Sequence, residues 1–101
     1  MPKMLVNWEH AEDRTLQRVA SAHRDRVQKL LDLMGTMDAP PEAVGHYQWY
    51  VEMYGSSNEV VARFINRGIT IRTVYSPNNM PVPSGAVRYK IDKNLNKFVK
   101  A

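Results

Sequence analysis

The segment SSNEVVARFINRGITIRTVY, residues 56–75, constrains the fold of this chain more than any other because two periodicities meet in it. Ser56 stands three residues before Glu59, which is the spacing of a capping box at the start of a helix. The apolar residues that follow recur at helical spacing: Val60, Val61, Phe64 and Ile65. Gly68 then provides a residue that accepts the positive φ with which many helices end. This part of the segment predicts a short helix over residues 57–67.

Beyond Gly68 the pattern becomes that of β-strands. Apolar and polar side chains alternate over residues 69–75 and again over 86–92, and a short third strand is expected over residues 97–99 after the turn-like KNLN. Three prolines between the first two strands predict a long exposed loop. A second interpretation makes VVARFINRGITIRTVY a helix-turn-helix whose second helix opens at Thr70. The β-branched residues there are poor helix formers, which favours the strand.

The first half of the chain is expected to be helical. No Gly or Pro interrupts it between Asn7, a candidate N-cap, and Met34, after which Gly35 ends the helix. Its apolar seam has alternating spacings of four and three: Leu16, Ala20, His23, Val27, Leu30 and Met34. After the connector GTMDAPP, a second helix is predicted over residues 41–54 with an aromatic centre, HYQWYVEMY.

These elements predict an α+β fold: a long N-terminal helix and two shorter helices, followed by a small antiparallel β-hairpin or meander. We expect a single domain over residues 1–101, with a helical part (7–54) and a part made of a short helix and a basic hairpin (56–101). The expected core is Leu16, Val27, Leu30, Tyr47, Val51, Val61, Phe64, Ile71 and Tyr89. Because the seam of the first helix covers under three heptads, it is expected to pack within its own subunit, which favours a monomer over a dimer formed through this helix.

The absence of cysteine and of long apolar runs indicates the compartment in which the protein is expected. The chain has 101 residues and no cysteine, so it forms neither disulfides nor Cys-ligated metal sites, which suits a reducing compartment. Its start, MPKMLVNWEH, lacks the apolar run of a signal peptide, and no later run is long enough to span a membrane. We therefore expect a cytoplasmic protein that does not bind membranes.

Charge is distributed unevenly along the chain. Residues 1–54 hold six bases and eight acids, whereas residues 55–101 hold eight bases and two acids, so that a net charge of −2 is followed by one of +6. Such an asymmetry indicates a polyanion or an acidic protein surface as partner. The alternative is that the excess of lysine and arginine only keeps a small domain in solution.

No enzyme motif occurs in the sequence. Walker-type, GxGxxG, GxSxG and HExxH patterns are all missing, and His10, His23 and His46 are isolated from one another. None of the three has a neighbour at the spacing of metal ligands on one helix face. We therefore expect a non-enzymatic protein without a metal site or cofactor.

The basic residues of the second half are the candidate binding site. If the strands over 69–75 and 86–92 pair, Arg72, Arg88 and Lys90 share the face away from the core. This layout is similar to the wing of a winged-helix domain. The full set of candidate contacts is Arg63, Arg67, Arg72, Arg88, Lys90, Lys93 and Lys97, with Trp49 and Tyr50 as aromatic contacts. The sequence thus predicts a small regulatory module that binds nucleic acid through its phosphates. The alternative is an inhibitor or adaptor that docks on an acidic surface of a larger protein.

Overall fold

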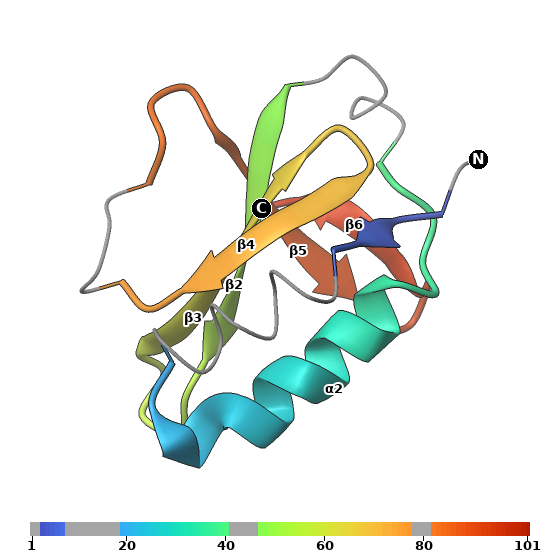
Figure 1. The fold of residues 1–101 in the computed structure, drawn as a ribbon. Coiled ribbons are helices and arrows are strands. Elements are labelled where there is room, and N and C mark those ends of the chain that lie inside the picture. Colours follow the sequence, from blue (N-terminus) through green and yellow to red (C-terminus); the bar gives the residue numbers. More distant parts are fainter. Residues whose placement is uncertain (1–2, 8–18, 41–46, 78–81) are drawn as a thin grey trace.

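The structure, a computed structural model, describes residues 3–7, 19–40, 47–77 and 82–101. This part of the chain forms a six-stranded mixed sheet with one α-helix and one short 3-10 helix (Figure 1). In chain order the elements are β1 (Leu5–Val6), η1 (Ser21–His23), α2 (Arg24–Met34), β2 (Gln48–Tyr54), β3 (Val60–Arg67), β4 (Thr70–Tyr75), β5 (Val87–Asp92) and β6 (Lys97–Lys100). The expected fold of three N-terminal helices followed by a small hairpin or meander is therefore wrong.

The strands lie in the order β1-β4-β3-β2-β5-β6. β2, β3 and β4 form an antiparallel meander, β5 runs parallel to β2, and β6 returns antiparallel to β5. The short β1 pairs parallel with β4 at the other edge, and Figure 1 shows the strands curled above α2. The strands that were expected to pair as a wing-like hairpin, β4 and β5, are separated by β3 and β2. That hairpin does not exist in this fold.

β2 is a strand because apolar and polar residues alternate along it. Trp49, Val51 and Met53 are buried, whereas the residues between them are half-buried or exposed. A period of two is typical of a strand that is buried on one side only. The predicted helix over 41–54 is therefore wrong from Gln48 onward, and residues 41–46 lie outside the described ranges.

β3 stands where a third helix was expected. The Gly55 N–H donates to the Glu59 carbonyl at 2.7 Å, and Asn58 has a φ of 62°. Ser56 and Glu59 therefore belong to a turn between β2 and β3 rather than to a capping box. The apolar residues after Glu59 occur in adjacent pairs four apart, a spacing that helices and strands both allow. Their β-branched and aromatic side chains favour the strand.

Gly68 opens a hairpin turn instead of ending a helix. It lies with Ile69 in a two-residue loop between Arg67 and Thr70, and its φ is 57°. A positive φ at the first loop position is required by type II′ hairpin turns, and glycine adopts it without steric cost. The strands predicted over 69–75, 86–92 and 97–99 are confirmed as β4, β5 and β6.

α2 is shorter than the helix expected over residues 8–34. Ala20 has a ψ of 141°, which is extended backbone, so the helical turns begin with η1 and α2 only after it. The end at Met34 and the cap at Gly35 are confirmed, since the Gly35 N–H donates to the Leu31 carbonyl. Leu16 lies outside the described ranges. No helix in those ranges is long and apolar enough to cross a membrane.

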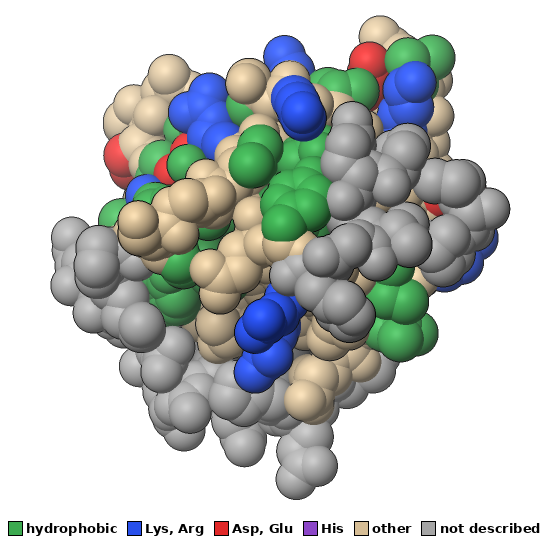
Figure 2. Space-filling model, turned by 90° about the horizontal axis from the view of Figure 1, so that it is seen from above, with side chains coloured by type: hydrophobic (Ala, Val, Ile, Leu, Met, Phe, Trp, Pro, Cys, Tyr) green, Lys and Arg blue, Asp and Glu red, His purple; other side chains and the backbone are tan. Residues whose placement is uncertain are grey.

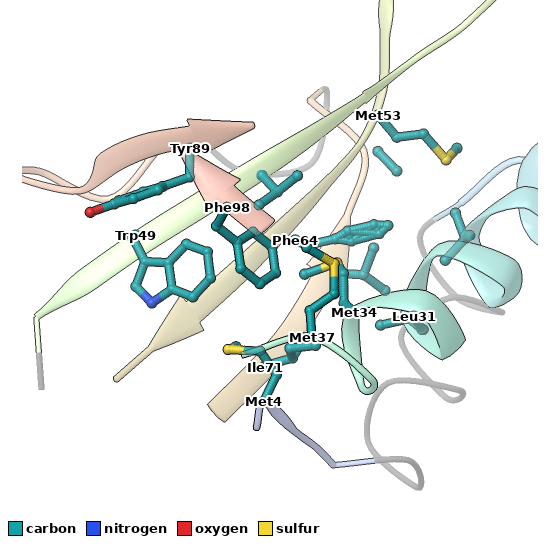
Figure 3. Close-up of a cluster of buried hydrophobic side chains, with 14 of the residues drawn as sticks. Met4, Leu31, Met34, Met37, Trp49, Met53, Phe64, Ile71, Tyr89 and Phe98 are labelled. Carbon is teal, nitrogen blue, oxygen red and sulfur yellow. The ribbon is translucent and has the colours of Figure 1, made fainter. Parts of the chain in front are cut away.

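The core lies between α2 and one face of the sheet. Val27, Leu31 and Met34 of α2 are buried against side chains from five strands and from the segment after α2 (Figure 3). The rings of Tyr89 and Phe98 meet Trp49 edge to face, with centroids 5.1 and 5.0 Å away. Of the expected core, the buried members are Val27, Val51, Val61, Phe64, Ile71 and Tyr89, while Leu30 and Tyr47 are partly buried.

Candidate binding groove

A groove opens where β2 and β5 separate in front of α2. The two strands pair only over Trp49–Val51 and Val87–Tyr89, although both continue for three more residues. Beyond this point, the end of β2 and residues of β5 line a groove of about 560 Å³ whose third wall is α2. The groove is thus a consequence of parallel strands that diverge over an underlying helix.

The lining of the groove is aliphatic at its bottom. Leu30 and Leu33 of α2 face Val51 and Met53 of β2 and Ile91 of β5. Val51 and Met53 are buried, whereas the other three side chains are partly exposed. Tyr54 is the one aromatic residue among the described lining residues, and its hydroxyl donates to Glu52. The other apolar lining residues are aliphatic, so the groove is suited to receive aliphatic groups.

Four basic side chains surround the aliphatic lining. Arg26 and Lys29 lie on α2, and Lys90 and Lys93 lie on β5 and in the turn after it. All four residues are exposed. Bases therefore stand on two opposite walls of the groove, and among the described lining residues Glu52 is the only acid.

Arg26 also connects two walls of the groove. Its Nη2 donates to the main-chain carbonyl of Tyr54 at 2.8 Å, so a helix side chain satisfies a carbonyl at the end of β2. In a continuous sheet, a carbonyl at this edge would accept from a neighbouring strand. The contact therefore marks the point at which β5 has moved out of reach.

Glu52 is neutralised by neighbouring cations. Its Oε2 accepts hydrogen bonds from Nε and Nη2 of Arg63 at 3.1 and 2.9 Å. Its Oε1 accepts one from the Tyr54 hydroxyl at 3.1 Å and lies 3.6 Å from Nη1 of Arg88. The Glu52 and Arg63 side chains are only 8% and 13% exposed, whereas Arg88 is 51% exposed. With both of its oxygens engaged, Glu52 acts as a counter-ion inside a positively charged region.

Tyr54 links this carboxylate to the groove. Burial raises the pKa of its hydroxyl, and the hydrogen bond and negative charge of Glu52 raise the pKa further. The hydroxyl, which is protonated at neutral pH as in any tyrosine, donates to Glu52, while the Tyr54 carbonyl accepts from Arg26.

The two aromatic residues that were expected at a contact surface are placed differently. Trp49 is fully buried, and its Nε1 donates to the Gly68 carbonyl at 2.9 Å. Tyr50 is half-buried on the other face of β2, where the Arg63 guanidinium lies 5.9 Å from its ring centroid. Trp49 is thus a core residue, and Tyr50 is partly covered by Arg63.

The predicted basic residues do not form one cluster. Lys90 and Lys93 line the groove, Arg88 lies beside Glu52, and Arg63 is engaged by the same carboxylate. Arg67, Arg72 and Lys97 are exposed on β3, β4 and β6. Figure 2 shows the Lys and Arg side chains of one view in separate groups among hydrophobic and neutral ones.

Strand alternation nevertheless places several of these bases on one side of the sheet. Register pairs Tyr50 with Arg88, Gln48 with Arg67 and Lys97 with Asp92. Since alternate residues of paired strands share a face, the bases on the side away from α2 include Arg63, Arg67, Arg88 and Lys97, whereas Lys90 is counted with the groove that it lines. We call this set the outer-face bases.

Sequence reasoning missed the contribution of α2 to the groove. Arg26, Leu30 and Leu33 recur at intervals of four and three, which places a base and two leucines along one side of the helix. The expected seam included Leu30 as a core residue and assigned no role to Arg26. What hid the groove was the wrong assignment of β2 as a helix, because no strand then faced this side of α2.

The described residues contain no group of three or more His, Asp or Glu side chains placed to hold a metal ion. Comparison of the chain with known protein families, with characterised proteins and with solved structures finds no match.

Proposed function

We propose that this protein is a non-catalytic binding module that docks on an acidic region of a protein partner through the groove between α2, β2 and β5. The observation that carries the proposal is the aliphatic lining with Arg26 and Lys29 on one side and Lys90 and Lys93 on the other. A groove of this kind combines burial of apolar side chains with long-range attraction of negative charge, and the second effect mainly raises the association rate.

Nucleic acid is the second candidate partner, and the outer-face bases favour it. The exposed members of this set, Arg67, Arg88 and Lys97, would contact phosphates from β3, β5 and β6. Such contacts supply affinity without sequence specificity. The large aromatic rings that would stack on bases are mostly in the core, since Trp49, Phe64, Tyr89 and Phe98 are buried. For this reason the groove supports a protein partner better than the outer face supports nucleic acid.

Two double variants with equal charge changes separate the candidates. Lys29→Glu with Lys93→Glu reverses two exposed groove bases, and Arg67→Glu with Lys97→Glu reverses two exposed bases of the outer face. Each variant is the matched control for the other, and circular dichroism with thermal melting checks that both remain folded.

Binding is measured with fluorescein-labelled polyglutamate and with labelled single- and double-stranded DNA and RNA, at about 50 and about 200 mM salt. We expect polyglutamate to bind the parent protein and the outer-face variant, and to bind the groove variant at least about tenfold more weakly. Tight nucleic-acid binding that the outer-face variant alone loses would favour the second candidate. Equal effects of both variants on polyglutamate would contradict the groove proposal.

A further inference from the structure

We infer that the groove binds an extended acidic peptide segment whose aliphatic side chains enter between α2 and the diverging strands. This inference rests on the proposed function and specifies the chemistry of the ligand. It follows from three properties of the groove: the separation of the strands, the nature of the bottom and the positions of the charges.

The separation of β2 and β5 favours an extended backbone. Pairing stops at Val51 and Tyr89, and both strands run on as a pair of diverging edges. The Tyr54 carbonyl at this edge is satisfied by Nη2 of Arg26, an exposed side chain that has other rotamers. A peptide N–H can replace that donor, because strand addition at an open edge uses main-chain hydrogen bonds of this kind. Arg26 would then be released toward a carboxylate of the peptide.

The apolar residues at the bottom of the groove favour a peptide with aliphatic side chains, which we call its anchors. Leu30, Leu33 and Ile91 are only partly buried and therefore still have apolar surface to cover. Each aliphatic side chain that covers this surface removes apolar area from water and so favours binding. In an extended peptide, side chains at positions i and i+2 point the same way, so two aliphatic residues at this spacing reach the bottom together.

The charges define what flanks these anchors. Arg26 and Lys29 stand on the α2 wall and Lys90 and Lys93 on the opposite wall. The one acid among the described lining residues, Glu52, is neutralised by Arg63 and does not oppose a negative ligand. Acidic residues next to the anchors point the opposite way in an extended peptide, toward the open side of the groove, where the exposed bases of both walls can reach them. The ligand has the pattern of acidic, aliphatic, variable, aliphatic and acidic residues.

The test uses the whole protein and three short fluorescein-labelled peptides of equal length and nearly equal charge. One contains only Glu, Asp and Ser; the second has two leucines at i and i+2; the third has them at i and i+4, the spacing of a helix. By fluorescence anisotropy we expect the second peptide to bind at least about tenfold more tightly than the first. The third is expected to bind more weakly than the second.

Methyl NMR of the unaltered protein locates the peptide without a mutation. Methyl signals of Leu30, Leu33, Met53 and Ile91 are expected to shift on addition of the second peptide, with those of Leu5 and Leu95, exposed elsewhere, as controls. The groove variant Lys29→Glu with Lys93→Glu should weaken binding of all three peptides, and the outer-face variant should not.

The outcomes separate this inference from the proposed function. Equal affinity for all three peptides, lost in the groove variant, would overturn the aliphatic anchors and leave the acidic partner in place. Preference for the i and i+4 peptide would overturn the extended conformation. If no peptide binds, or if both variants bind equally well, the inference and the proposed function fail together.

Discussion

The two faces of β2 show how one short strand serves two purposes. Toward α2 it presents Trp49, Val51 and Met53, which are enclosed by apolar neighbours. On the other face it presents Tyr50 and Glu52, whose neighbours are arginines and a tyrosine hydroxyl. The residues of the first face are buried by apolar packing, whereas those of the second are covered by charged and polar partners.

This difference implies that the two faces contribute differently to the stability of the fold. A buried aromatic ring stabilises the fold by the apolar area that it removes from water. A partly buried ion pair contributes little net stability, but it is costly to break because one charge is left without a partner. The core face should therefore dominate the free energy of unfolding, and the charged face should set local geometry beside the groove.

Trp49→Ala tests the core face and should have the largest effect. Trp49 is fully buried, contacts Tyr89 and Phe98 edge to face, and donates to the Gly68 carbonyl. We expect the free energy of unfolding to fall by about 3–5 kcal/mol, measured by urea denaturation. Trp49→Phe, which keeps an aromatic ring, should cost less than half as much. A cost of Trp49→Ala below about 1 kcal/mol would contradict its role at the centre of the core.

Glu52→Ala tests the charged face and should have the next largest effect. It leaves the Arg63 guanidinium, which is 13% exposed, without the carboxylate that accepts two of its hydrogen bonds. We expect a loss of about 2–3 kcal/mol in the free energy of unfolding, also measured by urea denaturation.

The control for Glu52→Ala removes both partners at once. Glu52→Leu combined with Arg63→Met replaces the buried pair by apolar side chains, so the double variant should be close to the parent in stability. Glu52→Leu and Arg63→Met are also measured singly. If the double variant loses as much free energy of unfolding as these two single variants together, the pair is not coupled and the interpretation of this face is wrong.

The strands of the sheet show why only part of the fold could be predicted from the sequence. β4, β5 and β6 were predicted correctly, because β4 and β5 alternate clearly and β6 follows a turn-like tetrad. β5 and β6 pair antiparallel, as expected of a meander, but the expected pairing of β4 with β5 was wrong, since local periodicity defines a strand but not its neighbour. β5 pairs with β2, almost forty residues earlier in the chain, and this long-range contact has no local signal.

β2 and β3 were missed because several of their apolar residues satisfy two periods at once. Val51 and Tyr54 are three apart and fit a helix face, yet Trp49, Val51 and Met53 fit a strand just as well. The connection in Asn66-Arg67-Gly68 fits a helix end and also a hairpin turn. Tertiary packing resolved both ambiguities in favour of strands, as it often overrides local propensity.

The candidate site was predictable in its charge but not in its shape. Lys90 and Lys93 were expected at a binding surface, and the structure places them in the groove. The α2 wall could not be anticipated, because Arg26 and Lys29 line a groove only once β2 is a strand that diverges from β5. A groove between distant segments depends on topology, and topology was the part of the fold that sequence patterns did not determine.

Asn66→Leu tests a buried polar residue on the core face and, unlike the other variants, should increase stability. Asn66 is fully buried, and its amide oxygen and nitrogen have no hydrogen-bond partner among the residues that the structure describes. Replacing it by an apolar side chain of similar volume should raise the free energy of unfolding by about 1 kcal/mol, measured by urea denaturation. Asn66→Asp, which introduces a charge at the same place, should lower it. A loss of stability in Asn66→Leu would show that the amide is satisfied in solution.

Arg88→Gln gives the smallest expected effect and the sharpest test of the charged face. Arg88 and Arg63 approach the same carboxylate, but Arg88 is 51% exposed and lies 3.6 Å from Glu52, whereas the Arg63 side chain is 13% exposed and its Nη2 lies at 2.9 Å. Water and salt screen the exposed pair, so Arg88→Gln should change the free energy of unfolding by no more than about 0.5 kcal/mol. Arg63→Gln, the matched change at the buried partner, should cost several times more, because it leaves the buried Glu52 carboxylate without its main counter-ion. Urea denaturation at low and high salt measures both variants. Equal losses would mean that burial does not distinguish the two arginines, and the contrast between the faces of β2 would then have to rest on the core residues alone.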